Sequence, residues 1–283
     1  MSGNHVYLNG EIVPADRAKI SVFDTGLLHG ASVFTTMLAH NGKVFRMGRH
    51  LARLSDNARR IGLTHTATGE ELTAAVDRVL EANALAEARV RITLTAGAVG
   101  MNVRPMTIVT AVAFRNEPRW YAKGLRVIVN SVRQYEGDPI AGVKTGCYLT
   151  RVLARQAAAA IGADEALWFT TAGHLTEACF CNVFLVRDGA VHTPSLATPI
   201  LAGVVREAVI ELCGADGISV HADDVIGGEE IPKSREVFLT SSVAGIRPVV
   251  CVEDYPIGDG APGPVTRRVM AAYAKLLEKE CGG

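Results

Sequence analysis

Residues 141–162, AGVKTGCYLTRVLARQAAAAIG, place one lysine directly before an alanine-rich run that is typical of a helix. The chain has only seven lysines, and Lys144 stands between Val143 and Thr145 instead of among charged neighbours. In an apolar environment the charged form of a lysine loses hydration, which favours the neutral amine. A neutral amine is a nucleophile toward an aldehyde. The alternative is a lysine whose ammonium reaches water from a strand end.

The composition predicts a folded, soluble protein. The 283 residues are 48% hydrophobic and 20% charged, and the formal net charge is zero. The sequence has no basic stripe and no acidic tail. Nothing in it therefore indicates nucleic acid or an anionic membrane as a partner. No apolar run approaches the roughly 18 residues of a membrane span, and the first residues lack the apolar stretch of a secretory signal. We therefore expect a cytoplasmic protein of one large or two ordinary domains.

The six cysteines do not form a disulfide framework in so long a chain. Cys179 and Cys181 lie among apolar residues, and no matching pair of Cys or His has the spacing of a metal site. We expect reduced thiols and no metal.

The hydrophobic pattern predicts helices and strands mixed along the whole chain. Turn dipeptides predict hairpins at Asn9-Gly10, Asn41-Gly42 and Asp188-Gly189. Apolar residues at helical spacing predict helices over 46–63, 69–85, 201–214 and 263–279. Further strands are predicted over 88–97, 106–114, 125–135, 165–170 and 235–242.

This mixture favours two domains of the α/β or α+β class. The stretch RNEPRWYAKG, residues 115–124, breaks the pattern with proline and charge. We therefore predict a smaller domain over 1–116, a linker over 117–124, and a larger domain over 125–283 that carries Lys144. Active sites favour the cleft between such domains, which is where we expect the site.

Three other features bear on the role of Lys144. Glu177 lies among small and apolar residues, so its carboxylate needs a cationic partner. One candidate partner is a protonated pyridine nitrogen, the pairing that makes pyridoxal phosphate an electron sink. Gly203 stands at the start of a predicted helix, whose free amides can bind phosphate. Ser241 and Ser242 end a predicted strand with hydroxyl donors, and Arg53 is a fixed charge for the same phosphate.

Each feature alone is commoner as an ordinary surface charge, helix start or strand end. Together, and in this order, they resemble the class IV aminotransferases, the fold-type IV enzymes that use pyridoxal phosphate. The resemblance runs through VYLNGEIVPADRAKISVFDTGLLHGASVF, FRMGRHLARL, the lysine stretch, LTEACFCNVFLV, LAGVVREAV, VFLTSSVAGIRPV and GPVTRR, and so covers nearly the entire chain.

The resemblance implies a role for each matching residue. Lys144 is the residue that binds the cofactor aldehyde and then moves a proton, and Glu177 is the partner of the pyridine nitrogen. The implied cofactor-binding residues also include Arg53, Asn182, Gly203, Val204, Val205, Ser241 and Ser242. The family often has threonine at the position of Val205, so a side-chain contact to phosphate is lost there while the amide remains.

The resemblance leaves the reaction open between two branches. One is transamination of a small branched-chain-type or D-amino acid with a 2-oxo acid, which we favour because most members of the family are transaminases. The other is β-elimination by an aminodeoxychorismate lyase, giving 4-aminobenzoate and pyruvate. Thr36 stands where lyase-like members place a threonine near the lysine, although it also suits a strand. A third hypothesis is a non-catalytic protein that only binds the cofactor.

The implied substrate-binding residues are His29, Phe34, Arg89, Arg91, Tyr148 and Ala244. The match to branched-chain enzymes is incomplete, since His29 replaces their usual tyrosine and Tyr148 comes one position early. Arg89 and Arg91 share a strand face and could clamp a carboxylate, as expected for a D-amino-acid enzyme, or could be solvated. The family further implies a homodimer. Substrate identity, chirality and amino acceptor are not determined by the sequence.

Overall fold

The computed structural model describes residues 5–65, 67–98 and 100–282. The chain forms two compact units. The first unit comprises Met1–Arg115, Val143–Cys147 and Leu277–Gly283, and the second comprises Asn116–Gly142 and Tyr148–Leu276. Both units combine helices with a β-sheet, which confirms the predicted mixed α/β class.

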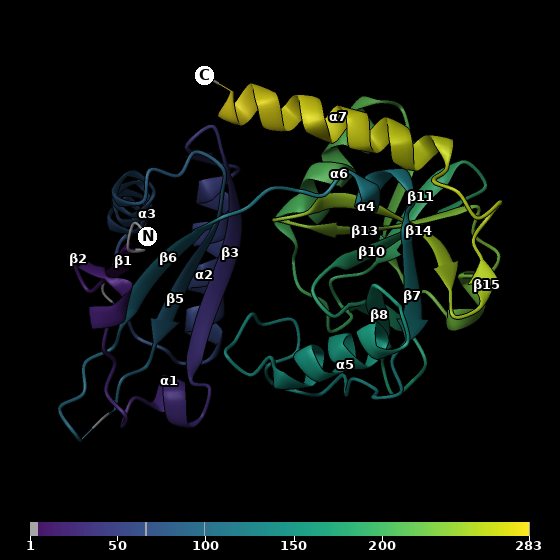
Figure 1. The fold of residues 1–283 in the computed structure, drawn as a ribbon. Coiled ribbons are helices and arrows are strands. Elements are labelled where there is room, and N and C mark those ends of the chain that lie inside the picture. The colour runs from purple at the N-terminus through teal and green to yellow at the C-terminus, as the bar shows by residue number, and fades with distance from the viewer. Residues whose placement is uncertain (1–4, 66, 99, 283) are drawn as a thin grey trace. The chain divides into compact units, whose positions relative to one another are not determined.

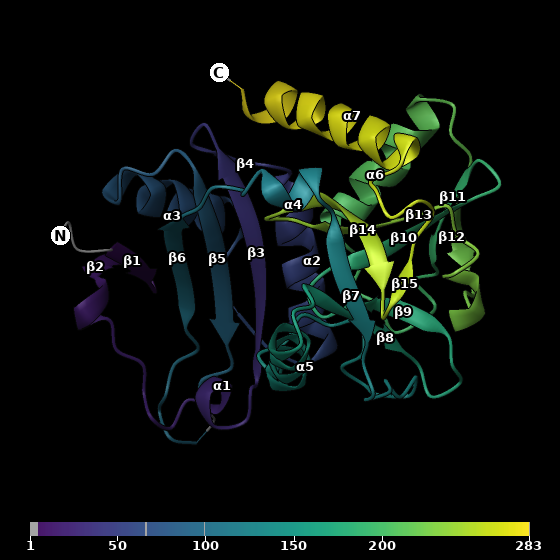
Figure 2. The same cartoon turned by 45° about the vertical axis from the view of Figure 1, so that its right-hand side comes forward.

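The first unit is built on a six-stranded sheet in the order β2-β1-β6-β5-β3-β4, part of which is visible in Figures 1 and 2. Its strands are β1 His5–Leu8, β2 Glu11–Pro14, β3 Ser32–His40, β4 Lys43–Val44, β5 Ala88–Thr95 and β6 Thr107–Ala113. Its helices are the short α1 Thr25–Leu28, α2 Met47–Arg60, α3 Gly69–Ala82 and the 3₁₀ turn η1 Ala15–Arg17.

The two predicted hairpins of this unit are confirmed. Asn9 and Gly10 join β1 to β2, and Asn41 and Gly42 join β3 to β4. All four residues have positive φ, between 45° and 106°, which asparagine and glycine adopt more readily than other residues.

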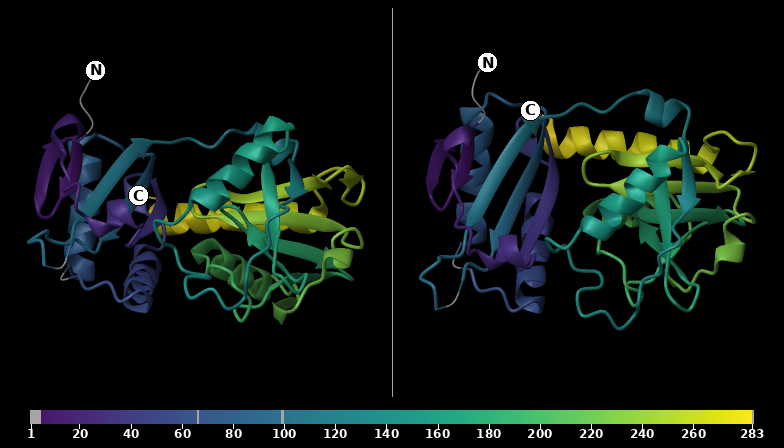
Figure 3. Two further views of the ribbon diagram at one scale, coloured as in Figure 1. Left: turned by 90° about the horizontal axis from the view of Figure 1, so that it is seen from below. Right: turned by 60° about the horizontal axis from the view of Figure 1, so that its bottom comes forward.

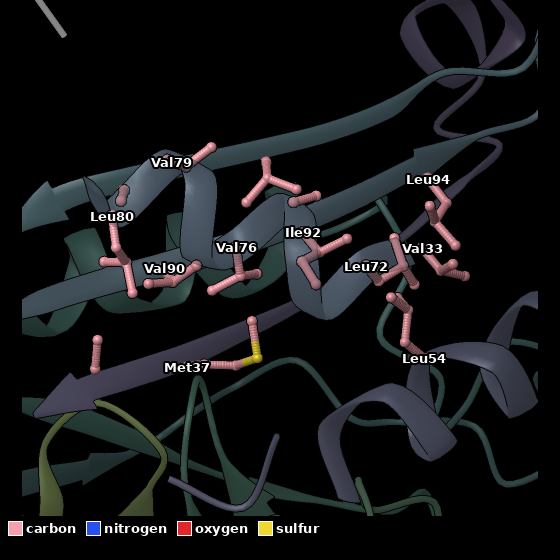
Figure 4. Packing of buried hydrophobic residues seen from close by; sticks show 14 of the residues in the cluster. Val33, Met37, Leu54, Leu72, Val76, Val79, Leu80, Val90, Ile92 and Leu94 are labelled. Atoms are coloured by element: carbon pink, nitrogen blue, oxygen red, sulfur yellow. The ribbon is translucent and has the colours of Figure 1, made fainter. Parts of the chain in front are cut away.

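The core of the first unit lies between its sheet and helices α2 and α3. Figure 4 shows Leu72, Val76 and Val79 of α3 beside Val90 and Ile92 of β5. The helical residues recur at three- and four-residue spacing, and the strand residues at two, so each element presents one apolar face. This packing makes β3 and β5 a rigid base for the side chains on their other face.

The second unit is built on a nine-stranded sheet in the order β12-β11-β10-β13-β14-β7-β8-β9, with β15 beside β14. Its strands are β7 Leu125–Val129, β8 Glu165–Phe169, β9 Leu175–Ala178, β10 Asn182–Arg187, β11 Ala190–Pro194, β12 Val220–Asp224, β13 Glu236–Ser241, β14 Gly245–Val252 and β15 Tyr255–Pro256. Its helices are α4 Arg119–Ala122, α5 Leu149–Ala160, α6 Val204–Ala215, the 3₁₀ turn η2 Gly228–Glu230, and α7 Pro264–Cys281 as far as Leu276.

Helices α5 (teal) and α6 (green) lie on opposite sides of the strands of this unit (Figure 3). The hairpin predicted at Asp188-Gly189 is confirmed as the turn between β10 and β11. The core beneath it gathers apolar side chains from β7, β10, β13 and β14. The predicted linker 117–124 contains the short helix α4.

The segment Val143–Cys147 belongs to the first unit although its sequence neighbours belong to the second. It pairs with β3 through an antiparallel bridge between Val33 and Thr145. Lys144 is thus carried on the sheet of the first unit. The predicted boundaries 1–116, 117–124 and 125–283 stay a prediction.

All six cysteines are free thiols. Among the described residues, no helix combines the length and the apolar character that a bilayer crossing needs.

Candidate active site

Lys144 is held beside β3 by backbone hydrogen bonds on both sides. The amide of Phe34 donates to the Lys144 carbonyl at 2.9 Å, and the amide of Gly146 donates to the Ser32 carbonyl at 2.8 Å. Because side chains alternate in an extended segment, Val143 joins the core while Lys144 takes the other face. The lysine is only 9% exposed.

The amine of Lys144 lies over an aromatic ring. Its Nζ is 4.6 Å from the centroid of Phe34, and the guanidinium carbon of Arg91 is 3.5 Å from the same centroid. Cations are attracted to the face of an aromatic ring, so Phe34 helps to hold both groups. The predicted residues Lys144, Phe34 and Arg91 are therefore brought together.

Thr36 and Arg89 lie on the same two strands. Thr36 pairs with Arg91 in the register of β3 and β5, which puts it on the sheet face that carries Phe34. Arg89 alternates with the buried Val90 and is exposed. The Nε of Arg91 donates to Thr93 Oγ1 at 3.0 Å, so this arginine is partly engaged within the strand.

Arg53 reaches β3 from helix α2. Its Nη2 donates to Thr35 Oγ1 at 3.2 Å, and His50 Nδ1 lies 2.9 Å from the same hydroxyl. His50 is almost fully buried. Burial of the imidazole, with the nearby charges of Arg53 and Lys144, holds the pKa of His50 well below 6.5. The ring is thus neutral at physiological pH, and it packs among cations without adding charge.

His29 follows the short helix α1 and is exposed. The thiol of Cys147, three residues after Lys144, lies 3.8 Å from the carbonyl of His29. The loop that carries His29 is thereby placed next to the lysine segment within the first unit.

In the second unit, Glu177 on β9 is buried and paired with Arg151 of helix α5. Arg151 Nη2 donates to Glu177 Oε1 at 2.6 Å, and its Nη1 donates to the carbonyls of Ala178 and Cys179. Burial is the largest single influence and works toward a lower pKa of Arg151, but the charge of Glu177 together with Tyr148, Cys179 and the hydrogen bond to Glu177 raises that pKa. The burial of Glu177 is therefore already compensated by a cation of the chain.

The other oxygen of Glu177 is bound by the loop that leads into α6. Oε2 accepts from the amide of Leu201 at 3.1 Å and from Asn182 Nδ2 at 3.4 Å. Asn182 Nδ2 also donates to the Leu201 carbonyl at 2.8 Å. A Cβ on Gly203 would clash with Asn182 Oδ1, so only glycine permits this close approach.

Gly203 is the N-cap of α6, as predicted, and no side chain caps it. The first helical residues, Val204 and Val205, are buried. The first amides of a helix have no partner within the helix and carry the positive end of its dipole, so they suit an anion.

The end of strand β13 carries several hydroxyl groups. Ser241 Oγ accepts from the amide of Ala244 at 3.2 Å, and Ser242 is half-buried in the same turn. Thr240 Oγ1 is buried and has no hydrogen-bond partner among the described residues. Elsewhere in this unit, Tyr148 stacks on Phe180 with centroids 6.0 Å apart.

These donors and acceptors fit pyridoxal phosphate. A carboxylate offers about four acceptor sites. The hydrogen bonds of the described residues use three on Glu177, which leaves room for one more donor. Within the second unit, the Thr240 hydroxyl, which has no partner among the described residues, and the start of α6 are donors of the kind that a phosphate needs.

Arg151 and His50 are not among the residues predicted from the sequence. Arg151 stands with Arg155 in an otherwise largely apolar helix, which was a usable signal for a buried acid elsewhere. His50 lies three residues before Arg53 and so shares its helix face, a signal equally present in the sequence.

Comparisons with known proteins identify the family of the chain. The family model described as amino-transferase class IV matches residues 32–252. An Escherichia coli K12 protein named branched-chain-amino-acid aminotransferase is 31% identical over 295 residues, covering 98% of this chain and 94% of its own length.

Two solved structures are similar over nearly the whole chain. A branched-chain amino acid aminotransferase from T.th., with pyridoxamine 5'-phosphate, has a TM-score of 0.89 at 28% identity, covering 96% of this chain and 93% of its own. The branched-chain aminotransferase of Thermoproteus uzoniensis with norvaline has a TM-score of 0.89 at 30% identity, covering 98% and 96%.

The chain belongs to the class IV aminotransferase family. Members of this family are pyridoxal-phosphate enzymes, so the predictions of the fold-type IV family, of a transaminase and of the cofactor are confirmed. The individual site residues stay predictions.

Proposed function

We propose that this chain transfers the amino group of a small amino acid of the branched-chain type to a 2-oxo acid, with pyridoxal phosphate bound on Lys144. The observation that carries the proposal is the buried Lys144 amine on the face of Phe34, in a chain of this family. The primary amine of a lysine is the nucleophile that condenses with an aldehyde.

When bound, pyridoxal phosphate supplies an aldehyde that condenses with amines and a ring that accepts negative charge from the α-carbon. The remaining steps fall to the chain. Lys144 Nζ would hold the cofactor through its aldehyde. The same amine would take and return a proton at the substrate, and so serve as both base and acid.

The other residues bind and orient. Arg53, the first amides of α6, Ser241 and Ser242 would hold the phosphate, where fixed charge and helix dipole favour an anion. Glu177 would accept a hydrogen bond from the ring nitrogen on its remaining acceptor site. Arg151 holds the carboxylate in place for that contact through the bond to Oε1.

The substrate preference is supported by the relatives, which are named branched-chain aminotransferases. Within the first unit, Phe34 puts apolar surface beside Lys144 that suits a small side chain. Arg91 is the candidate for the substrate carboxylate. A D-amino-acid enzyme with Arg89 and Arg91 as a clamp is the alternative.

The half-reaction tests the proposal. Holoenzyme given L-leucine, L-isoleucine, L-valine or a D-amino acid should lose its visible absorbance as the cofactor takes the pyridoxamine form. 2-Oxoglutarate or pyruvate should restore it. Lys144→Ala should abolish turnover, while Lys233→Ala, at an exposed lysine, should match the wild type. A protein that binds the cofactor but never changes its spectrum with any donor is a carrier, contrary to the proposal.

Aminodeoxychorismate separates the two reaction branches. A transaminase releases no pyruvate from this compound in the absence of a 2-oxo acid. Pyruvate release without an acceptor would assign the lyase reaction instead.

We also propose that the chain acts as a homodimer in the cytoplasm. The free state of all six cysteines supports a reducing compartment. An exposed apolar segment, which comprises Ile20, Val22, Phe23, Leu27 and Leu28, supports self-association. Light scattering of the purified protein tests the dimer, and cell fractionation tests the compartment.

A further inference from the structure

Two histidines face each other at the edge of the sheet in the second unit. Strands β11 and β12 are parallel, and His192 is the register partner of His221. Their rings are stacked, with centroids 4.6 Å apart and planes 9° from parallel. Asp224, at the end of β12, places its Oδ2 2.6 Å from His192 Nδ1.

The three side chains offer one ligand atom each within 4.8 Å of one another. In a tetrahedral zinc site with bonds of about 2.0 Å, neighbouring ligand atoms are about 3.3 Å apart. The lone pair of an imidazole nitrogen lies in the ring plane, so one ring must rotate out of the stack for both nitrogens to point at one ion. His221 is exposed and Asp224 is half-buried, so both have room to move.

Arg187 is the charged side chain next to the cluster, and its contacts decide whether the Asp224 carboxylate can bind a cation. Arg187 is bound by Glu230, and its Nη2 lies 3.8 Å from Asp224 Oδ2 and 3.1 Å from His192 Nδ1. A single ring nitrogen cannot donate to Asp224 and accept from Arg187 at once. Arg187 keeps Glu230 as an ion-pair partner, so a bound cation could replace its guanidinium beside Asp224 and His192 without leaving it unpaired.

We propose that His192, His221 and Asp224 bind one divalent ion of the class that imidazole favours, represented by Zn²⁺. Two imidazoles and one carboxylate suit zinc, copper or nickel, whereas Mg²⁺ and Ca²⁺ take oxygen ligands. The ion would fasten β12 to β11. Arg206 of α6 already donates to the carbonyls of Pro194 and Ala222, at 3.0 Å each, so the same edge supports the helix whose start is the proposed phosphate site.

The test is metal binding to the untagged holoenzyme, first freed of metal by a chelator. Calorimetry with Zn²⁺ should give one site per chain. His221→Ala, at an exposed position, should weaken binding about a hundredfold or more, because one of three ligands is lost. Asp224→Asn should weaken binding as well, and an excess of Mg²⁺ should not compete.

His174→Ala is the matched control in the same unit. His174 is bonded to Thr170 through its own backbone amide and carbonyl, so its imidazole can be removed without breaking these bonds. This variant should bind zinc as the wild type does.

A second readout does not depend on activity. Saturating Zn²⁺ should raise the melting temperature of the wild type and of His174→Ala by a few degrees, and leave His221→Ala unchanged. Absence of a saturable site, or equal zinc affinity of His221→Ala and the wild type, would overturn the proposal.

Discussion

Glu177 and Arg151 form a buried ion pair in the second unit. Their side chains are 5% and 15% exposed, and the Nη2–Oε1 distance is 2.6 Å. Arg151→Gln would leave the carboxylate without its cation, since the neighbouring amides cannot replace a charge. We expect the free energy of unfolding in urea to fall by about 3–5 kcal/mol.

Arg59→Gln is the matched control for Arg151. Arg59 also pairs with an acid, Asp56 at 2.8 Å, but it is 74% exposed on α2. Its loss should cost less than about 0.5 kcal/mol. Equal effects of the two substitutions would show that burial does not set the strength of the Arg151 pair.

His50 predicts a dependence of stability on pH. Its folded pKa is lowered by burial and by the charges of Arg53 and Lys144, against 6.5 in the unfolded chain. Below pH 6.5 the unfolded chain therefore binds a proton that the folded chain does not. Stability from this group is present above the unfolded pKa and is lost as the pH falls.

His50→Gln measures that contribution. Between about pH 7 and pH 5 the free energy of unfolding of the wild type should fall by up to about 2 kcal/mol more than that of His50→Gln. Urea titrations of both proteins at the two pH values give the difference directly. Parallel pH profiles would mean that His50 titrates normally in the folded protein.

The sequence indicated some of these residues because their local context is unusual. Lys144 and Glu177 stood out as charges among apolar neighbours, and Gly203 as a helix start. Arg151 and His50 were missed because their partners come from other elements. The histidines of β11 and β12 were missed for the same reason, since ligand spacing along the chain does not reveal pairs formed by strand pairing.

Among the elements, the start of helix α6 depends on Gly203. A Cβ there would clash with Asn182 Oδ1 and would displace the side chain that binds Glu177 and Leu201. Gly203→Ala should lower the free energy of unfolding by about 1–3 kcal/mol, as overpacking does. The affinity for pyridoxal phosphate should fall as well, which absorbance titration of the apoenzyme measures.

Gly214→Ala, in the same helix, should stabilise the protein where Gly203→Ala destabilises it. A Cβ on Gly214 meets nothing within 4 Å, and alanine is the better helix former. We expect a gain of up to about 1 kcal/mol and unchanged cofactor affinity. If both alanine variants behave alike, steric contact with Asn182 is not what requires glycine at position 203.

The elements that were predicted well are those specified by adjacent residues. Asn9-Gly10, Asn41-Gly42 and Asp188-Gly189 turn the chain by their own backbone preferences. The segment Val143–Cys147 was placed with the second half of the chain, and the structure packs it against β3. That pairing joins residues far apart in sequence, and nothing in VKTGC itself specifies a partner strand.

At the scale of the whole molecule, the exposed apolar segment around Phe23 predicts that two copies of the chain associate. Val22, Phe23, Leu27 and Leu28 lie close together in sequence, and each of these apolar side chains is more than half exposed. Burying such a cluster against a second copy would remove it from water, and a charge placed in it would oppose that burial.

Phe23→Asp should therefore convert the proposed dimer of about 60 kDa, twice the chain mass of 30.0 kDa, into a monomer. Light scattering coupled to size exclusion measures the mass. Val225→Asp is the control, because Val225 is 59% exposed but lies in the second unit outside this cluster, and it should stay dimeric. A wild type with the mass of a single chain, or a Phe23→Asp variant that keeps the full dimer mass, would exclude this segment as the dimer contact.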